Sequence, residues 1–168
     1  MQNFTHYSPT EIVFGKDTEL QTGAKVKKWG GTKVLIVYGG GSAKKSGLLA
    51  SIETSLEAEG IPFAEWGDVK PNPRLAHAEE GIQYAIRENV DFVLGVGGGS
   101  AIDTAKAIAH GTANPQIPLC DIWYGKAALK KSLPIGAVLT IAAAGSETSA
   151  SAVLTDEAAR KKVVSAQI

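Results

Sequence analysis

The sequence is poor in the features that mark several large classes of protein. Among its 168 residues it has one cysteine, Cys120, so no internal disulfide or cysteine-rich zinc site can form. Its 17 basic and 17 acidic residues balance, which argues against a surface for nucleic acid or acidic membranes. No apolar run approaches the roughly 20 residues of a membrane helix, and the first residues show no signal segment. These absences predict a cytoplasmic, globular protein without nucleic-acid or membrane partners.

Catalytic and metal-binding motifs are equally scarce. The histidines, His6, His77 and His110, are isolated, and no HxxxH, HExxH or Cys/His cluster is present. His110 is expected at the end of a helix, where a cation is favoured. A GxSxG segment for a nucleophilic serine is also missing. We therefore predict no catalytic residue and no metal site within this chain.

The chain does contain two glycine turns, each after a pattern typical of a buried strand. Residues 39–42 and 97–100 both read Gly-Gly-Gly-Ser, and they follow apolar runs at 34–38 and 92–96. Glycine lets backbone N–H groups come close to a ligand, and a following helix N-terminus favours an anion. Two such turns indicate a nucleotide with a pyrophosphate. The spacing differs from GxGxxG, and a tight strand-to-helix turn without a ligand is the plain alternative.

Hydrophobic periodicity predicts the fold. Strands at 33–38, 62–66, 92–96 and 135–141 alternate with helices at about 48–59, 73–86 and 101–110. This order is typical of an α/β protein with a doubly wound, mainly parallel, Rossmann-like sheet, which binds ligands at the carboxyl ends of its strands. The length fits a single dinucleotide-binding domain over residues 1–168.

Shorter elements are expected around this framework. Residues 11–15 indicate a short strand near the start, residues 152–164 a β-hairpin, and residues 111–134 a loop. Gly60 is expected just after the end of a helix. Asn72 is a candidate N-cap with Pro73 in the first helical position, and Ser100 and Asp103 have the spacing of a capping box.

The first glycine turn also bears on the choice of cofactor. No Asp or Glu lies between Tyr38 and Lys45 to accept a hydrogen bond from a ribose 2′-hydroxyl, whereas Ser42, Lys44 and Lys45 would suit a 2′-phosphate, and hence NADP(H). Solvated lysines at a helix start are the alternative. Hydroxyls near the end of the strand at 135–141 offer further ligand contacts or ordinary turn chemistry: Thr140, Ser146, Thr148 and Ser149.

Taken in order, these motifs resemble the iron-containing alcohol dehydrogenase family, and most closely its NADP(H)-dependent, butanol-dehydrogenase-like branch. The resemblance covers essentially the whole chain. It rests on a series of short motifs: Asn3-Phe4, Pro9-Thr10, Ile12-Val13-Phe14-Gly15, Tyr38 to Ser42 with Lys44-Lys45, Pro71-Asn72-Pro73, Gly97 to Ser100 with Asp103 and Lys106, Leu139-Thr140, and Gly145-Ser146-Glu147. The segment 142–144 departs from the family, which usually has Pro and Thr where this chain has alanines.

The resemblance implies reversible hydride transfer between NADP(H) and an alcohol or aldehyde by a homodimeric enzyme. It further implies that this chain is only the N-terminal cofactor-binding domain, inactive alone, because a second, helical domain of the family supplies the Asp and His ligands of Fe²⁺ or Zn²⁺. The second interpretation is a relative of glycerol dehydrogenase or dehydroquinate synthase, which have a similar cofactor domain. The alternative from another class of function is a stand-alone nucleotide-binding module without catalysis. Residue patterns and family positions together give the expected cofactor-binding residues: Gly39, Gly40, Gly41, Ser42, Lys45, Asn72, Gly97, Gly98, Gly99, Ser100, Asp103, Thr140, Ser146, Ser149 and Lys162.

Overall fold

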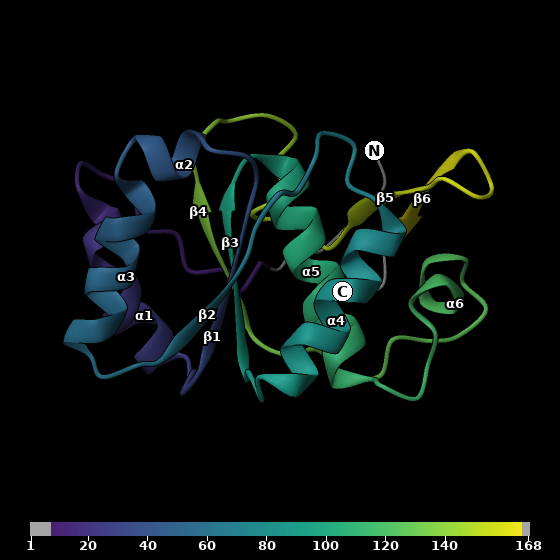
Figure 1. Ribbon diagram of the computed structural model, residues 1–168, viewed down its shortest axis with the longest axis horizontal. Coiled ribbons are helices and arrows are strands. Elements are labelled where there is room, and N and C mark those ends of the chain that lie inside the picture. The colour runs from purple at the N-terminus through teal and green to yellow at the C-terminus, as the bar shows by residue number, and fades with distance from the viewer. Residues whose placement is uncertain (1–7, 166–168) are drawn as a thin grey trace, which may run out of the picture.

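The computed structural model describes residues 8–165 and has an α/β architecture (Figure 1). Its central sheet contains four parallel strands in the order β2-β1-β3-β4, and this confirms the predicted doubly wound parallel sheet. The strand bounds are β1 (Val34–Tyr38), β2 (Phe63–Trp66), β3 (Phe92–Gly97) and β4 (Ile135–Leu139).

Helices cover both faces of the sheet (Figure 1). One face is covered by the 3₁₀-helix η1 (Thr18–Gln21), α1 (Thr22–Lys28) and α3 (Leu48–Ala58), and the other by α4 (Leu75–Arg87) and α5 (Gly99–Ala113). The short helices α2 (Ser42–Lys45) and α6 (Leu119–Trp123) lie in connections. Gly60 has φ 69° just beyond α3, as predicted for a glycine that ends a helix.

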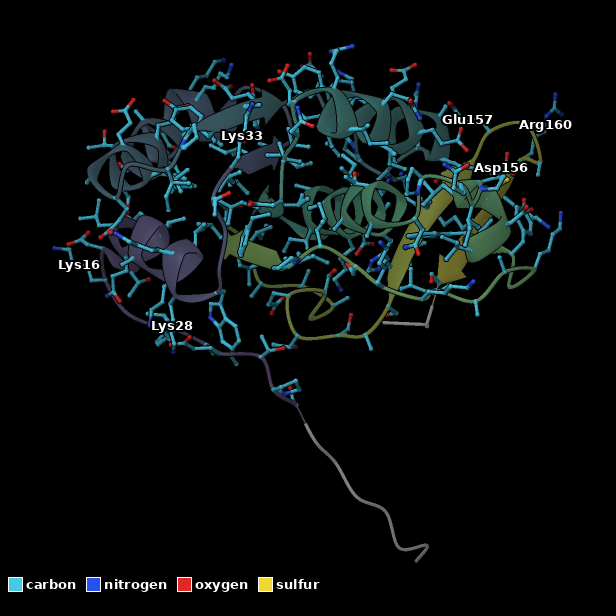
Figure 2. All side chains as sticks on the ribbon, turned by 90° about the horizontal axis from the view of Figure 1, so that it is seen from below. Lys16, Lys28, Lys33, Asp156, Glu157 and Arg160 are labelled. Atoms are coloured by element: carbon cyan, nitrogen blue, oxygen red, sulfur yellow. The ribbon has the colours of Figure 1, made fainter. Side chains whose placement is uncertain are left out.

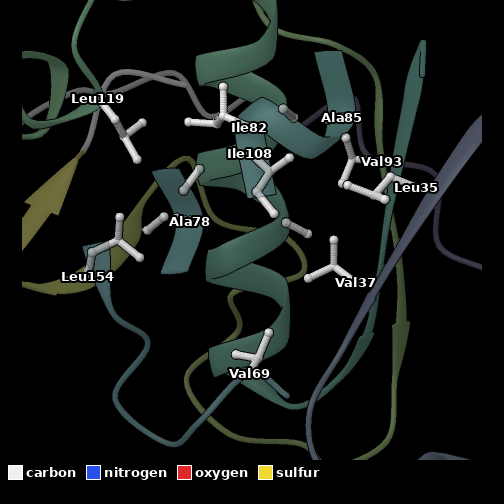
Figure 3. Close-up of a cluster of buried hydrophobic side chains, with 14 of the residues drawn as sticks. Leu35, Val37, Val69, Ala78, Ile82, Ala85, Val93, Ile108, Leu119 and Leu154 are labelled. Atoms are coloured by element: carbon white, nitrogen blue, oxygen red, sulfur yellow. The ribbon is translucent and has the colours of Figure 1, made fainter. Parts of the chain in front are cut away.

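Strand β1 shows why the sheet is buried on both sides. Its residues alternate between two hydrophobic cores: Val34, Ile36 and Tyr38 pack in the core that contains α3, whereas Leu35 and Val37 pack in the core of α4 and α5 (Figure 3). Every residue of β1 is buried. Burial on both faces explains the continuous apolar run that marked this strand in the sequence.

A small antiparallel hairpin, β5 (Ala152–Asp156) and β6 (Lys161–Ser165), packs beside α5 and α6, as predicted from the sequence. Leu154 of the hairpin joins the same core as Ile108 of α5 (Figure 3). At the far end of the hairpin, Asp156, Glu157 and Arg160 lie at the edge of the molecule (Figure 2). The hairpin is therefore part of the folded unit.

The predicted strand at residues 11–15 is wrong. Residues 11–14 have no regular secondary structure, and the segment lies against α1, where Glu11 accepts hydrogen bonds from Lys25 (2.7 Å), Lys28 (2.8 Å) and Trp29 (3.0 Å). These bonds, that from Lys25 most of all, lower the pKa of Glu11 to about 2. The apolar pattern of 12–14 has no neighbouring strand to pair with among residues 8–165, so side-chain anchoring to α1 decides its path.

Four other local predictions need correction. Helix α6 lies within the stretch 111–134 that was predicted to be a loop, and α5 is longer than the predicted 101–110. The predicted helix start at Asn72–Pro73 is wrong, and α4 begins only after Arg74. Residues 73–74 are instead extended beside the hairpin, where the Pro73 carbonyl accepts a hydrogen bond from the Thr155 N–H at 2.7 Å. The capping box at Ser100 fails because α5 already begins at Gly99.

Within residues 8–165, no helix is long and apolar enough to cross a membrane. His6 and the Asn3-Phe4 motif lie outside the residues that the structure describes.

Candidate cofactor site

The parallel strands place three of the predicted ligand-binding turns along one edge of the sheet, at the top of Figure 1. Residues 39–42 come directly after β1, residues 97–100 lie at the end of β3, and Thr140 comes directly after β4. The Thr140 N–H donates to the Gly97 carbonyl at 3.0 Å, so the second and third turns are joined directly. Ligands of doubly wound folds bind at this edge.

The turn between β3 and α5 exposes backbone donors. Helix α5 has Gly98 as its N-cap. Within the described part of the chain, no side chain caps this helix end and no acceptor meets the Gly99 and Ser100 N–H groups. A Cβ at Gly99 would meet nothing within 4 Å, whereas one at Gly98 would meet Ile141 at 2.9 Å. Open space in front of the uncapped end of a 15-residue helix suits an anion.

Two side chains of α5 hold the loop that follows β4. The Asp103 carboxylate accepts from the Ser146 hydroxyl at 2.5 Å and from the Val153 N–H at 3.1 Å. The Lys106 ammonium donates to the carbonyls of Ser146 (2.6 Å), Ser149 (2.8 Å) and Ser151 (2.8 Å). The helix with the uncapped N-terminus thus also fixes the loop beside it.

Lys106 belongs to the motifs of the family resemblance, but the sequence indicated no role for it. It is 5% exposed and its three carbonyl acceptors match the three N–H bonds of an ammonium. Burial lowers the pKa of Lys106, opposed by the negative charges of Asp103 and Glu147. One feature of the sequence could have indicated this buried role: Lys106 is the single charged residue in the apolar stretch 105–109. A charge on a buried helix face needs partners, so such a lysine predicts acceptors elsewhere in the fold.

The turn between β1 and α2 is surrounded by charged side chains instead. Glu65, at the end of β2, accepts from the Tyr38 hydroxyl at 2.7 Å and pairs with Lys44 at 3.2 Å. The Lys44 ammonium lies 5.0 Å from the centre of the Tyr38 ring. The hydrogen bond from Tyr38 lowers the pKa of Glu65, although burial opposes it. Sequence inspection missed this carboxylate because it comes from the neighbouring strand.

Three further predicted residues are exposed on the surface: Lys45, Asn72 and Lys162. Asn72 is exposed with φ 57°, in the connection between β2 and α4. Lys162 is exposed on β6, and no hydrogen bond within residues 8–165 joins it to the other predicted residues. Lys45 is exposed and has no ionic partner in the described part of the chain.

The described residues contain no group of three His, Cys, Asp or Glu side chains that could hold a metal ion. His77 donates a hydrogen bond from Nε2 to the Gly67 carbonyl (3.1 Å), and its ring centre lies 5.1 Å from that of Trp66. His110 does not end its helix as predicted: α5 continues to Ala113, and the ring is fully buried. Burial, assisted by the nearby Lys106 charge, lowers the pKa of His110 to about 4.

The chain has a doubly wound α/β fold, and its two glycine turns lie at the carboxyl ends of the strands, where such folds bind their ligands. Residues 9–167 match the family described as iron-containing alcohol dehydrogenase, and the chain belongs to that family. The chain is 43% identical over 164 residues to the probable NADH-dependent butanol dehydrogenase 2 of Bacillus subtilis, and 37% identical over 158 residues to the NADPH-dependent aldehyde reductase YqhD of Escherichia coli.

The alignments cover 98% and 92% of this chain but only 42% and 39% of those relatives, so the chain spans about two fifths of their length. A similar solved structure is the NADH-dependent butanol dehydrogenase A of Thermotoga maritima, with a TM-score of 0.95 and 44% identity. That match covers 98% of this chain and 41% of the Thermotoga chain.

Proposed function

We propose that residues 1–168 are one dinucleotide-binding domain, the cofactor-binding part of a longer alcohol dehydrogenase or aldehyde reductase. The observation that carries the proposal is the uncapped N-terminus of α5 between the Gly97–Ser100 turn and the loop held by Lys106, in a chain of this family. The butanol dehydrogenase and aldehyde reductase names of its relatives suggest an alcohol or aldehyde as substrate.

The residues present fit a dinucleotide. The turn at 97–100 would take the pyrophosphate on its free N–H groups, and the turn at 39–42 would take the adenosine ribose. The loop after β4 would face the remaining half of the cofactor. Bound there, the nicotinamide supplies the hydride chemistry, while this chain binds and orients it. The residues that we assign to the cofactor are Gly39, Gly40, Gly41, Ser42, Lys45, Asn72, Gly97, Gly98, Gly99, Ser100, Thr140, Ser146, Ser149 and Lys162, with Asp103 in support.

The described residues do not fit the catalytic metal that the family name implies. We therefore propose that Fe²⁺ or Zn²⁺ is held by residues outside this chain, and that the chain alone does not oxidise alcohols. Purified chain 1–168 should bind cofactor yet leave butanol unchanged with NADP⁺ or NAD⁺ and added Fe²⁺ or Zn²⁺. Metal-dependent butanol oxidation by this material would contradict the proposal.

We propose a preference for NADP(H) over NAD(H), because Ser42 and the unpaired Lys45 can donate to a 2′-phosphate. A charge-assisted contact of this kind is worth roughly 1.5–3 kcal/mol, so the preference should be about tenfold or more. Calorimetry on the purified chain measures the affinity of each cofactor. Gly39→Asp should shift the preference toward NAD⁺, because its carboxylate would accept from the ribose hydroxyl and repel the phosphate.

Three outcomes separate the parts of this proposal. Failure to bind either cofactor would contradict the dinucleotide site itself. Equal affinity for both would contradict only the stated preference, and an unaltered ratio in Gly39→Asp would show that the turn at 39–42 does not contact the ribose. Fluorescence melting of the variant serves as the control for folding.

We also propose a homodimer that buries residues 12–14. Ile12 and Phe14 are 70% and 98% exposed, which is unusual for large apolar side chains. The basis is this exposed apolar segment rather than the edge strand that the sequence suggested. Light scattering should show a dimer that weakens in Phe14→Ser, and a concentration-independent monomer would contradict it. The cytoplasmic location stays a prediction from the sequence.

A further inference from the structure

We infer that Glu65 is a specificity-determining residue of the cofactor site, which restrains the preference for a 2′-phosphate by keeping Lys44 in an ion pair. The inference rests on the proposed function, in which the turn at 39–42 receives the adenosine ribose. It adds Glu65, from β2, to a ribose-binding site that the sequence predicted from the turn at 39–42 and the lysines after it.

The geometry joins three segments at the mouth of this turn. Glu65 Oε2 accepts from the Tyr38 hydroxyl at 2.7 Å and lies 3.2 Å from Lys44 Nζ. Tyr38 is the last residue of β1, Lys44 belongs to α2, and Glu65 lies next to the last residue of β2. Because β2 runs parallel to β1, the carboxylate is brought to the same edge as the glycines.

The ion pair contributes little to stability, so its placement needs another explanation. The side chains of Lys44 and Glu65 are 57% and 36% exposed, and exposed pairs are typically worth under about 1 kcal/mol. The Tyr38 ring is already buried in the core that contains α3. A carboxylate at this exposed edge acts mainly on charges that approach the turn from solvent.

Electrostatics gives the direction of that action. With Glu65 ionised, the charges of the pair largely cancel, and Lys45 remains as the cation of α2 that has no ionic partner among residues 8–165. In doubly wound dinucleotide folds, an acidic residue near the end of the second strand accepts from a free ribose 2′-hydroxyl and disfavours a 2′-phosphate. Glu65 lies near the end of β2, beside the turn that would take the ribose, whereas Lys44 without its partner would attract the phosphate.

The test measures the affinities of NADP⁺ and NAD⁺ for the purified chain by calorimetry, with Glu65→Gln as the main variant. Releasing Lys44 should raise the preference for NADP⁺ over NAD⁺ by about fivefold or more at low salt. The gain should shrink at high salt, because exposed charges are screened. The double variant Lys44→Gln/Glu65→Gln should lose most of the gain.

Glu59→Gln is a matched control, because it breaks an exposed pair with Lys27 (2.9 Å) on the same face of the sheet but away from the turn. It should leave the cofactor ratio unchanged, and melting curves check that each variant folds. An unchanged ratio in Glu65→Gln, or an equal change in Glu59→Gln, would overturn the inference while the cofactor site stands. Absence of binding by either nucleotide would overturn the proposed function and this inference with it.

Discussion

The same four residues, Gly-Gly-Gly-Ser, form the turn after β1 and the turn at the end of β3, yet one turn leads into an exposed helix and the other into a buried one. After β1, helix α2 has only four residues. Its two lysines are exposed, and one of them, Lys44, forms an ion pair with Glu65. After β3, helix α5 has 15 residues, most of them buried, and its side chains hold the neighbouring loop from within. The difference arises from the helix that each turn leads into rather than from the glycines.

If the chain binds a dinucleotide as we propose, the two turns would contribute to binding in different ways. A single helical turn has little dipole, so cofactor recognition at residues 39–42 would depend on exposed side-chain charges. A long helix with free N–H groups carries a fixed positive end, so cofactor recognition at residues 97–100 would depend on the backbone. We therefore expect substitutions near the first turn to alter cofactor choice, and substitutions near the second to alter stability and affinity for either cofactor.

The largest effect should come from breaking the loop clamp on α5. Lys106→Met removes the ammonium and leaves three carbonyls of the loop without their donor. We expect the free energy of unfolding to fall by about 3 kcal/mol, the usual scale for a broken buried polar network. Urea denaturation measures this loss.

Lys44→Met at the first turn is the matched comparison, since it removes the same group from an exposed ion pair. Its loss should stay within about 0.5 kcal/mol, as for most surface substitutions. Similar losses in the two variants would mean that the clamp of Lys106 contributes no more than a surface contact, and the contrast between the two turns would fail.

The second effect is a pH dependence of stability that arises from His110 on α5. The pKa of His110 is about 4 in the folded protein but near 6.5 in the unfolded chain, which therefore binds a proton first as the pH falls. Stability should thus decrease between pH 6.5 and pH 4, and the His110 contribution amounts to about 2 kcal/mol between pH 7 and pH 5.

Urea denaturation of the parent and of His110→Gln at both pH values isolates this term. The variant should show a flatter decrease with falling pH, whatever its stability at pH 7. Glu65→Gln, at the first turn, should keep the parental slope, because the pKa of that carboxyl lies below its ordinary range. A parental slope in His110→Gln would show that His110 does not titrate as the structure implies.

Much of the fold was predictable because the responsible signals are local. The apolar runs of β1 and β3, the glycine-ended strands and the helical spacing of α3 and α4 each report burial along a single segment. Parallel order then resulted from the alternation of strands and helices, and it placed the glycine turns at one edge without further information.

The failures share a different cause, since each depends on a partner that is distant in sequence. Glu65 reaches the first turn only through pairing of β2 with β1, and Asn72 misses its expected cap because the hairpin binds residues 73 and 74. In the sequence Lys106 is an isolated charge, and its carbonyl acceptors come from the loop after β4, about 40 residues later. Such contacts leave almost no mark on the local pattern.

The smallest expected effect compares one glycine from each turn. Gly97 has φ 143°, a region that favours glycine, and an added Cβ would lie 3.1 Å from the Cβ of Ala101. Gly40 has no positive φ, and an added Cβ would meet nothing within 4 Å. Gly97→Ala should therefore lower the free energy of unfolding by about 1–2 kcal/mol through backbone strain, whereas Gly40→Ala should change it by less than about 0.5 kcal/mol. Urea denaturation of both variants under one set of conditions measures the difference. Equal losses would mean that the two turns impose the same backbone demand, and that the surrounding side chains alone distinguish them.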